Sequence, residues 1–206
     1  GCDPAYGSSD EADRTVISIW RCYSDAMVQV AEFCSPQPST YQCAWVLAHL
    51  AGYYGLTYLM PILEITGPGQ AVFDELQKVQ RLSSEIKPQD DSHNIRNILA
   101  NMRHFFYRRI DSLGGTGMVY QWKTTEDLKR RAMNQMKNGI ELGRMIPRSV
   151  ALCEEMRRIV NDDGHIGAEG RSKDDRVMAA ALAYQAWNTW VQPRVKAIGM
   201  SLANAA

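Results

Sequence analysis

The sequence predicts an α/β fold in which a mixed β-sheet is covered by helices on both faces. Three observations predict it. Runs rich in β-branched and apolar residues occupy 15–20 and 26–33, a nearly continuous apolar run fills 58–65, and segments with helical spacing lie between and after them. A continuous apolar run is typical of a strand buried on both faces, and strands mixed with helices are typical of a layered α/β domain.

Length and composition limit the class of protein. The 206 residues are enough for one domain with a sizeable core. We expect a single domain over 1–206 with a basic helical and hairpin elaboration at about 83–165. No apolar run approaches the roughly 20 residues needed to cross a bilayer, so no membrane partner is expected. The chain begins at Gly1 and shows no signal peptide, so we expect a piece of a longer, non-secreted protein.

The first half is expected to open with strands. Residues 1–6 are expected to form a strand that runs into a turn. With 15–20 and 26–33 it completes a three-stranded antiparallel meander, turning at Ser24 and Asp25. After a Pro-rich loop at 35–40, the expected elements are a helix at 41–54, a strand at 58–65, a turn at 66–69 and a helix at 70–82.

The second half is expected to be mostly helical. Thr125 and Ser149 have side chains that favour a helix N-cap, and Pro193 is expected to stop the last helix. The expected elements are a loop at 83–92, helices at 95–110, from Thr125, at 149–160 and at 174–191, strands at 118–122 and 165–168, and a turn or hairpin at 143–147.

Charge is unevenly spread, although the formal net charge is zero. Residues 1–95 carry 5 Lys and Arg against 12 Asp and Glu, and residues 96–176 carry 16 against 11. An acidic half beside a basic half suits a metal centre next to a surface that binds a polyanion, although ordinary charged helix faces give the same counts. The five cysteines form no Cys-x-x-Cys pair, which argues against a disulfide framework or a zinc site and favours a reducing, cytosolic setting.

Carboxylates stand at the ends of three expected elements. Asp3 lies in the first strand, Glu64 closes the apolar strand, and Asp174 and Asp175 open the last helix. An ionised carboxylate in an apolar strand is costly unless it is paired or bound to metal. Three converging carboxylates would repel one another, and oxygen-only ligands favour Mg²⁺ or Mn²⁺ over zinc. The sequence therefore predicts a site for two such ions, as used in phosphodiester hydrolysis.

Each acid also has a simpler structural explanation. Asp3 can cap the turn that follows it, Glu64 can stand just past the buried part of its strand, and the aspartate pair can serve only as a helix cap. Asp10 and Asp13 are further candidates for a ligand from the first turn. The order of the acids along one α/β chain (strand, strand, helix) favours a site.

Three motifs stand in order along the chain: Cys-Asp-Pro-Ala-Tyr-Gly at 2–7, Leu-Glu-Ile-Thr-Gly-Pro-Gly at 63–69 and Lys-Asp-Asp-Arg-Val-Met-Ala-Ala-Ala-Leu-Ala at 173–183. Together they resemble the nuclease domain of the large terminase subunit of tailed bacteriophages, over essentially the whole chain. The resemblance implies an RNase H-like, RuvC-like fold and a metal-dependent endonuclease that cuts concatemeric double-stranded DNA with little sequence specificity. It also implies as partners an ATPase domain of the same full-length protein, the small terminase subunit and the portal protein, in the host cytoplasm.

The resemblance also implies roles for particular residues. The family's first acid falls on Asp3, the second on Glu64 and the third on the aspartate pair. Of that pair Asp175 is favoured as the direct ligand, with Asp174 as a cap or outer group, and Asp174 is also kept as a candidate metal ligand. The chain departs from the family at three positions: Lys173 stands where His is common, Thr66 where Asn is common, and Met178 where a resolvase-like fourth acid would fall. No Gly-x-x-x-x-Gly-Lys-Ser/Thr motif occurs, so ATP hydrolysis is not expected.

Basic side chains near the presumed site would contact DNA phosphates, which position a duplex without reading its bases. The candidates are Arg144, Arg148, Arg171, Lys173 and Arg176. His104 and His165 are candidates for orienting a water or touching DNA, with a plain core or surface role as the alternative. Two other functions stay open: another RNase H-like nuclease such as a Holliday-junction resolvase, and a domain that mainly docks within the packaging motor.

Overall fold

The centre of the fold is a four-stranded mixed sheet. The computed structural model describes residues 1–7, 13–54, 59–83, 108–110, 118–162, 165–170 and 172–204. The strand order is β1 (Cys2–Asp3), β2 (Thr15–Cys22), β3 (Met27–Ser35) and β6 (Met145–Ile146). β1, β2 and β3 are antiparallel, and β6 runs parallel to β3. The predicted antiparallel meander is therefore confirmed.

The segment around Glu64 extends this sheet beyond β1. Glu64 donates its backbone N–H to the Cys2 carbonyl at 2.9 Å, and the Cys2–Leu63 pairing is parallel. On its other side the segment pairs in parallel with Trp122, whose N–H donates to the Leu63 carbonyl at 3.0 Å. The strand predicted at 58–65 thus appears as two bridges, and its first residue lies outside the described residues. This pairing sets Glu64 beside β1, the strand that carries Asp3.

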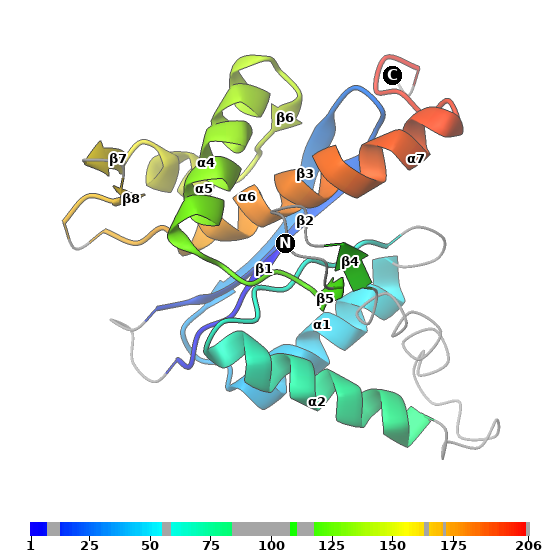
Figure 1. Cartoon of the computed structure of the whole chain (residues 1–206), viewed down its shortest axis with the longest axis vertical. Coiled ribbons are helices and arrows are strands. Elements are labelled where there is room, and N and C mark those ends of the chain that lie inside the picture. The colour runs from blue at the N-terminus through cyan, green and yellow to red at the C-terminus, as the bar shows by residue number, and fades with distance from the viewer. Residues whose placement is uncertain are drawn as a thin grey trace.

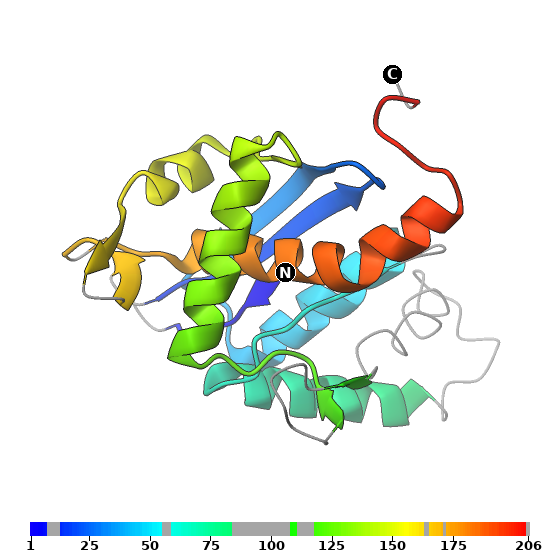
Figure 2. The same cartoon turned by 45° about the horizontal axis from the view of Figure 1, so that its top comes forward.

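Helices cover both faces of the sheet (Figure 1, Figure 2). α1 (Thr40–Tyr54) and α2 (Pro68–Ser83) lie on one face, and α4 (Glu126–Glu141), α5 (Val150–Met156) and α6 (Asp175–Ala186) lie on the other. The two faces have separate cores, because Ile62 packs with the cluster of Leu182 and its neighbour Leu63 with that of Leu76. Successive side chains of an extended segment point to opposite faces, so both faces are covered, as predicted. None of the helices in the described ranges is long and apolar enough to cross a bilayer.

α6 is buried on nearly all sides. Ala179, Ala180 and Ala181 expose no surface. Such small side chains let the helix lie directly on β2 and beneath α4, an arrangement visible in Figure 2. Gly139 of α4 allows the two helices to approach closely, because a Cβ there would meet the ring of Tyr184. The packing of α6 therefore fixes the position of its first residue, Asp175, relative to the sheet.

The end of this helix differs from the prediction. α6 continues through a π-helical turn, η2 (Trp187–Val191), into α7 (Gln192–Ala197), so the expectation that Pro193 stops the helix is wrong. Pro cannot donate a backbone hydrogen bond, and the wider turn just before it accommodates the missing donor.

Three other predicted elements change type or length. The helix predicted at 149–160 ends at Met156, and β7 (Ile159–Asp162) follows it, antiparallel to β8 (His165–Ala168). The end of the helix predicted at 95–110 is instead β4 (Arg108–Ile110), paired with β5 (Met118–Tyr120), while 84–107 lie outside the described residues. The turn or hairpin predicted at 143–147 contributes the edge strand β6. Strands of two to four residues are too short to show a hydrophobic period.

Candidate active site

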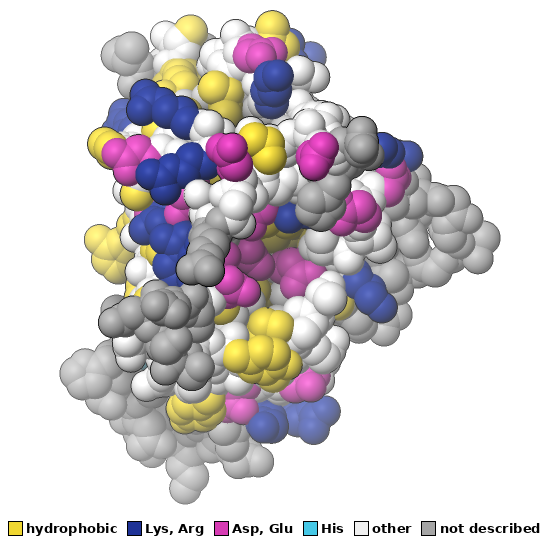
Figure 3. Space-filling view, turned by 90° about the vertical axis from the view of Figure 1, so that its left-hand side faces the viewer, with side chains coloured by type: hydrophobic (Ala, Val, Ile, Leu, Met, Phe, Trp, Pro, Cys, Tyr) yellow, Lys and Arg dark blue, Asp and Glu magenta, His cyan; other side chains and the backbone are white. Residues whose placement is uncertain are grey.

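The predicted acids Asp3, Glu64 and Asp175 line one pocket of about 570 Å³. Acidic side chains surround a hollow near the middle of the face shown in Figure 3. A second hollow of about 520 Å³ lies along β7 and β8 and shares no lining residue with the first. The lining of the acidic pocket is Asp3, Pro4, Ala5, Tyr6, Gly7, Asp13, Arg14, Glu64, Thr66, Pro68 and Asp175. The structure thus gathers three acids that are far apart in the sequence.

Asp3 shows most directly that the acids act on one another. Burial raises the pKa of this carboxyl well above its usual value, and the neighbouring carboxylates of Asp175, Glu64 and Asp174 raise the pKa further. Lys129 lowers the pKa of Asp3, but less than the other causes raise it. Burial and like charges both disfavour the ionised form, so metal-free Asp3 holds its proton more tightly than an ordinary aspartate.

Glu64 is almost fully buried, with 7% of its surface exposed. The backbone N–H of Thr66 donates to its Oε2 at 2.8 Å, and that of Thr124 donates to its Oε1 at 3.2 Å. The turn after Glu64 is tight: a Cβ on Gly69 would lie 1.7 Å from the Glu64 carbonyl oxygen. Because both carboxylate oxygens accept backbone hydrogen bonds, the side chain is held in one orientation.

Asp175 is the first residue of α6 and is 8% exposed. Its Oδ2 accepts two hydrogen bonds from Arg14, one from the backbone N–H at 3.1 Å and one from Nε at 2.9 Å. Burial raises the pKa of Asp175 above its usual value; the Arg14 contacts lower it, and Asp13 raises it. Asp175 therefore has both a pocket position and a fixed cationic partner.

Asp174 precedes α6 at the N-cap position, but its side chain makes no capping hydrogen bond. Its Oδ2 instead accepts a hydrogen bond from Lys129 Nζ at 2.8 Å, which joins the start of α6 to α4. Of the two roles predicted for Asp174, a cap or an outer group, the structure does not show the side-chain cap, because this carboxylate pairs with Lys129. Its assignment as a metal ligand stays a prediction.

The acids suit a hard divalent cation by chemistry and by charge. Carboxylate oxygens are the preferred ligands of Mg²⁺ and Mn²⁺, and a cation relieves the repulsion that raises the pKa of Asp3. As the side chains stand, the described residues contain no group of three His, Cys, Asp or Glu placed to hold one ion. Asp175 is drawn toward Arg14. The acidic pocket, lined by Asp3, Glu64 and Asp175, is therefore the candidate metal site by the chemistry of its lining.

The predicted DNA-contacting residues occupy different settings. Arg144 and Arg148 are exposed on either side of β6, and Lys173 is partly buried just before α6. Arg176 is placed differently from the prediction, because its guanidinium bonds Glu155 and Glu32 inside the protein. Among the predicted residues, Arg171, Asp10 and His104 lie outside the described part of the chain.

The lesser candidates of the first turn and of β8 are only partly described. Asp13 is exposed and lines the acidic pocket, in line with its proposed assisting position. His165 begins β8, but its side chain lies outside the described residues.

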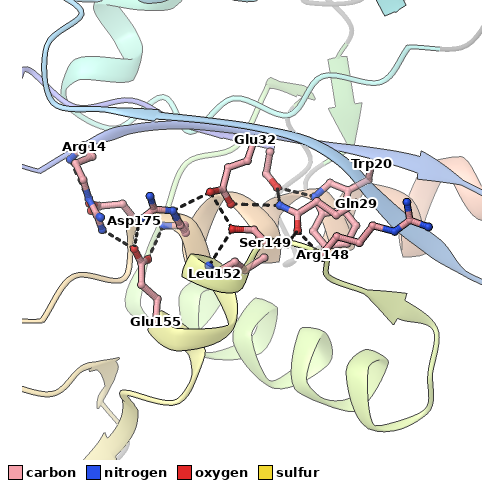
Figure 4. A network of polar contacts seen from close by, with 11 residues as sticks. Arg14, Trp20, Gln29, Glu32, Arg148, Ser149, Leu152, Glu155 and Asp175 are labelled. Atoms are coloured by element: carbon pink, nitrogen blue, oxygen red, sulfur yellow. Dashed lines mark hydrogen bonds and ion pairs between the residues drawn. The ribbon is translucent and has the colours of Figure 1, made fainter.

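A buried ion network beside the site was not predicted (Figure 4). Arg14 Nη2 bonds Glu155 Oε1 at 2.6 Å, Arg176 Nη1 bonds the same oxygen at 2.6 Å, and Arg176 Nε bonds Glu32 Oε1 at 2.8 Å. One sequence signal existed, since Glu155 stands three residues after the buried Leu152 and so shares its apolar face of α5. Nothing in the sequence marks Arg14 as its partner, because the two lie far apart along the chain.

The mixed sheet and the helices on both of its faces form an α/β fold of RNase H-like type, as predicted. Among solved structures, the chain is similar to the crystal structure of the large terminase nuclease from the thermophilic phage G20c with bound magnesium. The TM-score is 0.58 at 17% sequence identity, and the match covers 90% of this chain and 78% of that one. At this identity the likeness shows the fold alone. No family model matches the sequence, and no curated protein matches it.

Proposed function

We propose that the chain is a metal-dependent endonuclease that cuts double-stranded DNA, and the nuclease domain of a viral packaging terminase. The observation that carries the proposal is the acidic pocket, in which three neighbouring carboxylates add to burial in raising the pKa of Asp3. The fold shared with the phage G20c large terminase nuclease, whose structure holds magnesium, supports it.

In this proposal Asp3, Glu64 and Asp175 hold two Mg²⁺ or Mn²⁺ ions, with Asp174 as a further candidate ligand. Such ions, when bound, supply positive charge to the attacking and leaving oxygens of a phosphodiester. The protein's own contribution is orientation. Backbone N–H groups hold both Glu64 oxygens, and Arg14 holds one oxygen of Asp175, so two ligands are set before the substrate arrives.

Arg144, Arg148 and Lys173 are the proposed phosphate contacts, and Arg171 stays a candidate. Phosphate contacts give affinity without reading bases, which suits cleavage of concatemeric DNA with little sequence specificity. Arg176 is left out because Glu155 and Glu32 already hold its guanidinium. The proposed partners are an ATPase domain of the same full-length protein, the small terminase subunit and the portal protein, and the proposed setting is the host cytoplasm.

The test is plasmid cleavage in Mn²⁺ by Asp3→Asn, Glu64→Gln and Asp175→Asn variants. Each substitution keeps the shape and removes the charge, so we expect loss of cleavage with an unchanged circular dichroism spectrum. Glu154→Gln is the matched control, because Glu154 is exposed on α5 and we expect it to cut like the wild type. Wild-type cleavage by all three pocket variants would contradict the proposal.

Two further outcomes would favour a different function for the chain. Cleavage of four-way junctions in strong preference to linear duplex would indicate a resolvase. Failure of the wild-type chain to bind Mn²⁺ in titration calorimetry would favour a domain that mainly docks within the motor.

A further inference from the structure

The contact between Arg14 and Asp175 is one-sided. Arg14 donates twice to Oδ2, through its backbone N–H and its Nε. Both of these hydrogen bonds go to Oδ2, so Arg14 does not occupy Oδ1. Since Asp175 lines the acidic pocket, Oδ1 is the oxygen left for a cation.

The guanidinium of Arg14 is also held by a second acid, Glu155. Its Nη2 bonds Glu155, and Glu155 also accepts the Arg176 backbone N–H at 3.0 Å and Arg176 Nη1 at 2.6 Å. Ion pairs of this kind are short and directional, and a network of them holds each member in one geometry. The side chain of Glu155 is only 11% exposed, so water competes poorly for it.

The network is anchored to two further elements. Arg176 Nε bonds Glu32 on β3, and Glu32 also accepts hydrogen bonds from Ser149 Oγ at 3.1 Å and Gln29 Nε2 at 3.2 Å. Ser149 is the N-cap of α5. Arg14 is therefore tied to the sheet and to α5, and its guanidinium is not a mobile surface group.

We propose that Arg14 is a positioning residue that presents Asp175 to the metal, and that Glu155 keeps Arg14 in place. The inference rests on the proposed function. Its rival is that Arg14 competes with the cation for Asp175. The two differ in sign: loss of a positioning residue weakens metal binding, whereas loss of a competing positive charge strengthens it.

The experiment measures the Kd for Mn²⁺ by titration calorimetry, using the full chain and the Arg14→Ala, Arg14→Lys, Glu155→Gln and Glu154→Gln variants. Residues that orient metal ligands typically contribute about 10–100-fold to affinity, so we expect Arg14→Ala to bind Mn²⁺ at least about tenfold more weakly. Arg14→Lys keeps the charge but lacks the planar fork that reaches both acids, so it also weakens binding. Glu154→Gln removes a charge from the exposed side of the same helix as Glu155 and leaves the Kd unchanged.

A second readout separates positioning from simple destabilisation. The ligands remain in Arg14→Ala, so excess Mn²⁺ is expected to restore its cleavage rate, whereas Asp175→Asn stays inactive at any Mn²⁺ concentration. If Arg14→Ala does not fold, the Mn²⁺ affinities of Arg14→Lys and Glu155→Gln test the inference instead. Unchanged or tighter Mn²⁺ binding by the folded Arg14 variants would overturn this inference but not the proposed function. Absence of Mn²⁺ binding by the wild type would overturn the proposed function with it.

Discussion

Gly69→Ala is expected to disturb the site through the backbone of Glu64. The added Cβ would lie 1.7 Å from the Glu64 carbonyl oxygen, and real contacts of this type do not fall under 3.0 Å, so α2 or Glu64 must move by more than an ångström. Overpacking of this kind costs about 1–3 kcal/mol, and each kcal/mol lowers the Tm of a chain this long by about 2–4 °C. Because an ångström of misplacement can cost about 10²-fold in rate, cleavage is expected to fall by that order.

Gly67→Ala is the matched control for this prediction. Gly67 has a φ of +59° and open space around a Cβ, so alanine there strains the backbone by about 1–2 kcal/mol without pressing on Glu64. The two variants should therefore unfold at similar temperatures in a thermal melt but differ in plasmid cleavage. Equal cleavage by Gly69→Ala and Gly67→Ala would refute the reasoning that the close approach at Gly69 holds Glu64 in place.

Two other predictions concern pH and salt. The folded-state pKa of Asp3 is raised, so the stability that this carboxyl contributes is fully present below its unfolded pKa and is lost as pH rises through its folded pKa. Asparagine at this position does not ionise. The Tm of the metal-free protein should therefore fall less steeply with rising pH in Asp3→Asn than in the wild type. If the Tm of both proteins falls equally with rising pH, Asp3 is not the cause of the pH dependence. Arg148→Ala should weaken duplex binding and reduce the slope of log K against log salt by about 1, as measured by fluorescence anisotropy at several salt concentrations. A salt slope equal to that of the wild type would show that Arg148 does not contact DNA phosphates.

The elements that the sequence predicts well are those with strong local patterns. Val16, Ile17 and Ile19 predict β2, and Thr125 and Ser149 mark helix starts at which the structure shows both side chains capping. β4, β6 and β7 were not predicted as strands because two to four residues show no hydrophobic period, although the equally short β5 and β8 lie within the strands predicted at 118–122 and 165–168. The continuation of the helix through Pro193 was not predicted, because packing within the fold overrides the local preference of proline to end a helix.

For the site, the sequence predicts the acids but not what holds them. Asp3, Glu64 and Asp175 could be selected because each ends an element, and the structure places all three on one pocket. The partners that orient them come from distant parts of the chain: Arg14 for Asp175 and Lys129 for Asp174. No spacing rule relates such residues, since their contact depends on how the helices pack on the sheet.

The most direct test of the central claim is a crystal structure of the chain soaked in Mn²⁺, with the ions located by anomalous scattering. We expect ions in the acidic pocket, bound by Asp3, Glu64 and Asp175, with Arg14 still hydrogen-bonded to Asp175 Oδ2. Ions bound elsewhere, or none in the pocket at saturating Mn²⁺, would contradict it.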